Sequence, residues 1–156
     1  MSSTKRGDDR HAADYYITPQ WAIRNFLLAW PVATSITTVD WREDSRAEHK
    51  ADFLMWQPPN KFDMAITNPP FAIAQEVIDR CFQVVHPGGL VVMLLRLNFF
   101  GGAKRFDWWQ RTMPVACYVH SKRIGFTEDG KTDSIEYMHA VWVVGEEPRH
   151  TALRVI

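Results

Sequence analysis

The segment Asn68-Pro69-Pro70-Phe71 places an amide side chain and an aromatic ring on either side of two prolines. Neither proline can donate a backbone hydrogen bond, and a residue before proline is driven away from helical geometry. The apolar stretch 62–67 before this segment is therefore predicted to be a strand that ends abruptly at Asn68. Such an end holds an acceptor oxygen and a flat ring at the edge of a sheet where open α/β sheets bind ligands.

Helical and strand-like segments alternate around this motif. The predicted elements are, in chain order, a helix over 18–30, a strand over 35–41, a short helical piece over 42–51, the strand 62–67, a helix over 72–86 ended by Pro-Gly-Gly, a buried strand over 90–97, a loop with a helix over 98–114, and strands over 115–126 and 134–145. The last two strands form a hairpin. This order predicts an α/β three-layer sandwich with a mainly parallel sheet and a C-terminal antiparallel hairpin. Residues 1–14 read as a flexible arm, and 15–156 as a single domain.

The Asn68–Phe71 segment closes a hydrophobic strand and precedes an amphipathic helix. In this context it resembles the catalytic motif of the S-adenosylmethionine-dependent N6-adenine DNA methyltransferases, which are Asn-Pro-Pro-Phe type amino-methyltransferases. The resemblance implies a Rossmann-like fold, S-adenosylmethionine as cofactor and a flipped adenine in DNA as substrate. It also implies that Asn68, Pro69, Pro70 and Phe71 are the catalytic residues. The alternative interpretation is a plain turn between a strand and a helix.

Further segments resemble the same family in their order and spacing. The implied contacts are Tyr16, Thr18 and Pro19 with the methionine end of the cofactor, Asp40 (with Glu43 as second choice) with its ribose, Asp52 and Phe53 with its adenine, and Phe126 with the target base. Three of these residues have an alternative interpretation: Asp40 as a solvated strand end, Asp52 as a helix cap, and Phe126 as a core ring.

The chemistry of an exocyclic amine fits the motif. Its lone pair is delocalised into the ring, so acceptors placed against the amino hydrogens favour a pyramidal nitrogen and stabilise its developing positive charge. The Asn68 side-chain oxygen and the Pro69 carbonyl would be these acceptors, and Phe71 would stack on the base. No strong base is needed, because the proton can leave after the methyl group has been transferred.

Cations among aromatic residues suggest contacts with DNA. The candidate phosphate ligands are Arg96, Lys104, Arg105, Lys122 and Arg123. The rings near them are Phe99, Phe100, Trp108 and Trp109. The alternative for each ring is an anchor in the core.

One expected part is missing. The family has a first strand with a Gly-rich turn that admits the methionine portion of the cofactor, but only residues 31–34 occupy that place. Gly7 is the single glycine in residues 1–60. Three explanations are open: a deletion that weakens cofactor binding, an altered site completed by a second subunit, or natural residues that this sequence lacks. We favour the third, because the segments on both sides remain intact.

Composition narrows the class of protein. The 156 residues contain 18 Lys plus Arg and 18 Asp plus Glu, so nucleic-acid binding would need a local patch. No signal peptide or membrane span is predicted, and Cys81 and Cys117 lack metal-ligand spacing, as do the histidines. We expect a cytoplasmic protein without a metal, and a dimer is compatible with the sequence. The small size favours a phage or mobile-element origin. The alternative functions are methylation of RNA or of cytosine N4, and an inactive methyltransferase-like module that binds DNA or protein.

Overall fold

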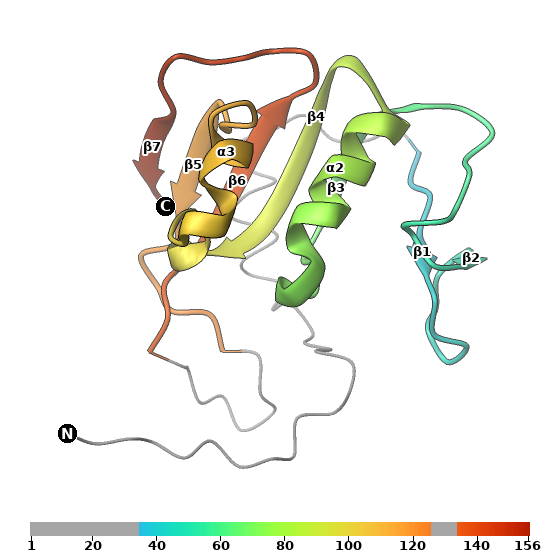
Figure 1. Ribbon diagram of the computed structural model, residues 1–156. Coiled ribbons are helices and arrows are strands. Elements are labelled where there is room, and N and C mark those ends of the chain that lie inside the picture. Colours follow the sequence, from blue (N-terminus) through green and yellow to red (C-terminus); the bar gives the residue numbers. More distant parts are fainter. Residues whose placement is uncertain (1–34, 126–133) are drawn as a thin grey trace.

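The computed structural model describes residues 35–125 and 134–156, in which a five-stranded sheet carries helices α2 and α3 in front of it (Figure 1). The strands lie in the spatial order β3 (Phe62–Thr67), β4 (Val85–Arg96), β6 (Tyr137–Val143), β5 (Ala116–Val119) and β7 (Ala152–Val155). β3 is parallel to β4 and β5 is parallel to β7, whereas β6 is antiparallel to both neighbours. The α/β class is confirmed. The prediction of a mainly parallel sheet is wrong, because the reversed strand β6 lies between β4 and β5 and makes the sheet mixed.

β4 forms the centre of the core. Residues 91–95 are each exposed by 1% or less. Val91, Met93 and Leu95 belong to the large cluster that α2 and α3 cover, while Val92 and Leu94 join two smaller clusters on the opposite face. Burial of both faces explains why this strand reads as an unbroken apolar run without polar alternation.

The helix that follows the Asn-Pro-Pro-Phe segment begins with a 3-10 turn, η1 (Phe71–Ile73), and continues as α2 (Ala74–Val84). The predicted helix over 72–86 is confirmed in its core but ends earlier, because Val85 is extended and starts β4. The Pro-Gly-Gly segment thus lies inside β4. A Cβ atom on Gly89 would lie 2.7 Å from the Asp63 carbonyl, so β4 can approach β3 there only with glycine.

The chain before β3 forms a separate parallel pair, β1 (Val39–Asp40) and β2 (His49–Lys50). The predicted strand over 35–41 shrinks to two residues, because residues 35–38 are exposed. The predicted helical piece over 42–51 is wrong: these residues form turns and then β2. Arg80 of α2 donates to the Trp56 carbonyl and attaches the following segment to the helix.

The predicted loop with a helix after β4 is confirmed as η2 (Leu97–Phe100), η3 (Ala103–Arg105) and the four-residue α3 (Phe106–Trp109). Phe99, Trp108 and Trp109 are buried. The ring centroids of Trp108 and Trp109 lie 4.6 Å apart, and those of Phe99 and Trp109 lie 5.6 Å apart. These rings extend the cluster that α2 covers.

β5 and β6 pair antiparallel, as expected for the predicted hairpin, although β5 is shorter than the predicted strand over 115–126. β7 was not predicted. All four of its residues are exposed, so they carry no burial pattern, and backbone hydrogen bonds such as Ala152 N–H to the Val115 carbonyl (3.0 Å) hold the strand. The predicted arm over 1–14, the helix over 18–30 and the hairpin connection lie outside the described residues. Within 35–125 and 134–156, no helix has the length and hydrophobicity needed to cross a bilayer.

Both cysteines lie in the large core cluster. Cys81 is on α2 and Cys117 is on β5, and they are exposed by 1% and 2%. Burial disfavours the thiolate and raises the pKa of each thiol to about 12.

Replacing a central β4 residue should destabilise the protein strongly. We expect Leu95→Ala to lower the free energy of unfolding by about 2–5 kcal/mol, because Leu95 is fully buried and its loss leaves a cavity. Urea denaturation measures the change. The matched control is Leu153→Ala on β7, whose side chain is 67% exposed; it should cost less than about 0.5 kcal/mol. Equal losses would contradict the central role of β4.

Candidate active site

The Asn-Pro-Pro-Phe segment leaves the sheet at the carboxyl end of β3. Thr67 is in register with Met93 of β4, so Asn68 is the first residue beyond the ladder. Asn68 is half-buried with its Oδ1 atom shielded from solvent, and Pro69 is buried. The Pro70 carbonyl accepts a hydrogen bond of 3.1 Å from the Ile73 N–H, which starts η1. The backbone around Asn68 is therefore fixed by β3 on one side and by η1 on the other.

The ring of Phe71 packs in the cluster on the face of the sheet opposite α2. Its centroid lies 6.1 Å from that of Tyr137, with 37° between the planes. The guanidinium carbon of Arg96, the last residue of β4, lies 4.2 Å from the Phe71 centroid. Leu94, Ile124 and Ile135 belong to the same cluster. A base that stacks on Phe71, as predicted, would have to share the ring with these contacts.

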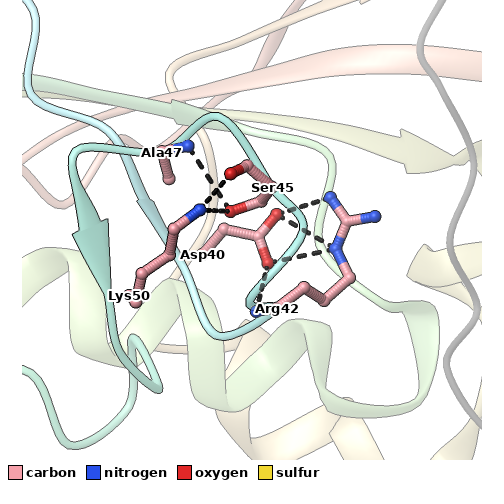
Figure 2. A network of polar contacts seen from close by, with 5 residues as sticks. All are labelled: Asp40, Arg42, Ser45, Ala47 and Lys50. Atoms are coloured by element: carbon pink, nitrogen blue, oxygen red, sulfur yellow. Dashed lines mark hydrogen bonds and ion pairs between the residues drawn. The ribbon is translucent and has the colours of Figure 1, made fainter.

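The carboxylate of Asp40, at the end of β1, is bound by Arg42 (Figure 2). Arg42 Nε lies 3.2 Å from each carboxylate oxygen, Nη2 lies 2.7 Å from Oδ2, and the Arg42 backbone N–H donates to Oδ1 at 3.0 Å. The side-chain hydrogen bonds are the main reason why the pKa of Asp40 lies below its ordinary value. Ribose hydroxyls would have to displace Arg42 from this carboxylate. Glu43, the second choice, is exposed in the next turn.

Neighbouring parallel strands bring Asp52 to the same edge as Asp40. The Ala51 N–H donates to the Asp40 carbonyl at 3.2 Å, directly before Asp52. The Asp52 carboxylate accepts from the Leu54 N–H at 2.9 Å within a turn, whereas the alternative interpretation expected the cap of a helix. Lys50 closes the loop between β1 and β2 by donating to the Ser45 carbonyl and hydroxyl (Figure 2).

This edge fits the adenosine half of S-adenosylmethionine in its chemistry. Two carboxylates can accept from ribose or adenine donors, and Phe53 offers a half-buried ring that packs on the core. Tyr16, Thr18, Pro19 and the short segment 31–34 lie outside the described residues. The contacts with the methionine half therefore stay predictions.

The five cations predicted to bind phosphate lie in different surroundings. Lys104 and Lys122 are exposed. Arg105 donates to the Phe99 carbonyl at 3.1 Å and to the Gly101 carbonyl at 2.6 Å, and Arg123 pairs with Glu136 at 3.2 Å. Arg96 instead lies on Phe71. Phe126 lies outside the described residues.

The rings proposed to stack on DNA mostly belong to the core. Phe99, Trp108 and Trp109 are buried, so the alternative interpretation as core anchors is correct for them. Trp108 Nε1 also donates to Asp79 of α2 at 2.9 Å. Phe106, in contrast, is 62% exposed, and nothing in the sequence distinguishes it from its aromatic neighbours.

The sequence alone does not reveal a buried histidine pair. His120 Nε2 and His139 Nδ1 lie 2.8 Å apart, and the two residues are exposed by 4% and 2%. Burial lowers the pKa of both, that of His139 to about 3, with the neighbouring His120 as a second cause. The available signal was the apolar strand context of each histidine. In the described ranges, no three His, Cys, Asp or Glu residues cluster as metal ligands would.

Comparison with known proteins finds no matching family model and no curated protein that matches the sequence. Among solved structures, the fold is similar to that of a Listeria monocytogenes protein provisionally assigned as a class I S-adenosylmethionine-dependent methyltransferase, with 14% identity and a TM-score of 0.49. The match covers 69% of this chain and 40% of that chain, so this chain spans less than half of the similar protein. A similarity of this extent does not show which activity this chain has.

Acid should destabilise the protein through the histidine pair. Because burial holds both pKa values below the ordinary 6.5, the unfolded chain binds more protons, and stability falls as the pH drops below 6.5. We expect a loss of about 1–3 kcal/mol between about pH 7.5 and about pH 5.5, measured by urea denaturation.

The His139→Gln variant should be less stable at neutral pH and lose about half of this pH dependence. The matched control, His86→Gln at an exposed position of β4, should retain it. An unchanged pH dependence in His139→Gln would contradict the role of the pair.

Proposed function

We propose that the protein transfers a methyl group from S-adenosylmethionine to the exocyclic N6 amino group of adenine in DNA, with the base flipped out of the helix. The observation that carries the proposal is the Asn68 amide, held with a shielded Oδ1 atom at the carboxyl end of β3 between a strand and a proline-fixed turn. A rigid acceptor at this edge is what methylation of a planar amine requires.

The residues of the chain would act by orienting the amine. Asn68 Oδ1 and the Pro69 carbonyl accept from its two hydrogens, which aims the nitrogen lone pair away from the acceptors and toward the methyl donor. When bound, S-adenosylmethionine would supply an electrophilic methyl group: the amine nitrogen would bond to its carbon while the carbon–sulfur bond broke and its electron pair stayed on sulfur. The surplus proton on nitrogen then leaves to water. The two prolines keep the acceptors still during transfer.

The edge formed by β1 and β2 would hold the adenosine part of the cofactor. Asp40 would exchange its hydrogen bonds with Arg42 for those of the ribose hydroxyls, and Phe53 would lie along the adenine ring. The same geometry would serve RNA or cytosine N4, because their amino groups are also planar. Protein contacts with the bases around the target would decide among these substrates.

A second candidate is a methyltransferase-like module that binds DNA or protein without catalysis. Two observations favour it: residues 8–60 contain no glycine that could admit the cofactor, and the Asp40 carboxylate is already engaged by Arg42. Calorimetric titration with S-adenosylmethionine separates the two candidates. A methyltransferase must bind the cofactor, whereas the module need not.

Removing the Asn68 side chain should abolish methyl transfer without unfolding the protein. We expect Asn68→Ala to reduce the rate of tritium transfer from labelled S-adenosylmethionine to adenine-containing DNA by about a hundredfold or more, because one of the two acceptors is lost. Circular dichroism checks the fold.

The matched control is Asn60→Ala, at an exposed position in the turn before β3, which should keep the wild-type rate. Equal rates for Asn68→Ala and Asn60→Ala would exclude Asn68 from the reaction. Absence of both cofactor binding and transfer in the wild-type protein would favour the binding module.

A further inference from the structure

Arg96 carries a charge that no described acidic residue pairs with. It ends β4, directly beside the Asn-Pro-Pro-Phe segment, with its guanidinium carbon 4.2 Å from the centroid of Phe71. Its Nε atom is shielded from solvent and has no hydrogen-bond partner. Across residues 35–125 and 134–156, the ion pairs involve Arg42, His49 and Arg123, and not Arg96.

The other arginines near the candidate site differ in this respect. Arg105 also lies over a ring, that of Phe99 at 4.6 Å, but donates to two backbone carbonyls. Arg123 has a carboxylate partner, and its side chain is half exposed. In the described part of the chain, the Arg96 guanidinium is therefore positioned by its stacking on Phe71, and its N–H groups have no acceptor there.

Among residues 35–125 and 134–156, no group accepts a hydrogen bond from the Arg96 guanidinium, so a bound anion is a candidate acceptor. The guanidinium stays protonated in proteins, and a shielded N–H group without an acceptor is costly. Its planar set of donors matches the oxygens of a phosphate or a carboxylate. The position of Arg96 beside Phe71 places such an anion next to the ring on which the target base is expected to lie.

We propose that Arg96 is a substrate-positioning residue that binds a backbone phosphate of the target nucleotide while its plane stays stacked on Phe71. This inference rests on the proposed function. Methyl transfer puts positive charge on the amine, and a guanidinium without a counter-ion nearby would oppose it. A nucleotide brings both parts in one unit: a base for the acceptors of Asn68 and Pro69, and a phosphate that neutralises Arg96.

The test measures binding of a fluorescent oligo-dT strand, about twenty nucleotides long, with a single central dA. Replacing Arg96 with Met should weaken binding about tenfold and reduce the slope of log affinity against log salt by about 0.7, the value for one phosphate contact on a single strand. Arg96→Lys should keep the slope, because it keeps the charge. The matched control, Arg149→Met at an exposed position between β6 and β7, should bind like the wild-type protein.

A methylphosphonate in place of the phosphate next to the dA removes a single negative charge. It distinguishes direct binding of that phosphate by Arg96 from a structural role of Arg96 in the fold. The wild-type protein should lose affinity for this strand about as much as Arg96→Met loses for the normal strand, and Arg96→Met should not distinguish the two strands. Thermal melting checks that each variant is folded.

Three outcomes would overturn the inference. The first is an unchanged salt slope in Arg96→Met, and the second is an equal loss of affinity for the methylphosphonate strand in the wild-type protein and in Arg96→Met. The third is a loss of S-adenosylmethionine binding in Arg96→Met while its oligonucleotide binding stays intact. The third outcome would mean that the Arg96 guanidinium binds the carboxylate of the cofactor and not a phosphate. If the wild-type protein transfers no methyl group but binds the strand through Arg96, the proposed function fails and only the phosphate contact of Arg96 stands.

Discussion

The pairing of β4 with strands on both of its sides is the constraint from which the candidate site follows. A shift of one residue would turn Val91, Met93 and Leu95 away from α2 and bring Val92 and Leu94 toward it. The parallel register with β3 then sets where Asn68 leaves the sheet, and the antiparallel register with β6 sets Arg96 opposite Tyr137. These two registers bring Phe71, Arg96 and Tyr137 together at the end of β4.

The candidate site has two parts, which differ in whether their charged side chain already has a partner in the protein. The Asp40–Arg42 pair is complete without a ligand, but its members are only two residues apart and their side chains are 27% and 22% exposed. The two side chains are partly buried and joined by several hydrogen bonds, so donors of a ligand would have to replace those of Arg42. On the other side, Arg96 is positioned by its stacking on the Phe71 ring. The carboxylate edge of β1 thus requires rearrangement, whereas the edge of β4 is preformed.

The sequence was most informative where burial and backbone chemistry coincide. The apolar run 90–97 and the proline pair after 62–67 gave strong signals, and both strands formed, although β4 begins at Val85 and ends at Arg96. The sequence did not predict the conformation of segments whose structure depends on tertiary contacts. Residues 42–51 have helix-forming composition but close a loop through Lys50 and Ser45, and β7 is held by backbone hydrogen bonds that leave no pattern in its side chains. The histidine pair and the Arg96–Phe71 contact join residues distant in sequence, so only the folded chain reveals them.

The burial of both native thiols makes the protein a convenient host for selective chemical labelling. Alkylating reagents attack the thiolate, and neither Cys81 nor Cys117 forms it near neutral pH while the fold is closed. A new cysteine placed on an exposed strand such as β7 would therefore take up a fluorophore alone, in the otherwise native chain. The same two thiols become reactive only when α2 or β5 opens, so their slow modification reports the rate at which the core comes apart.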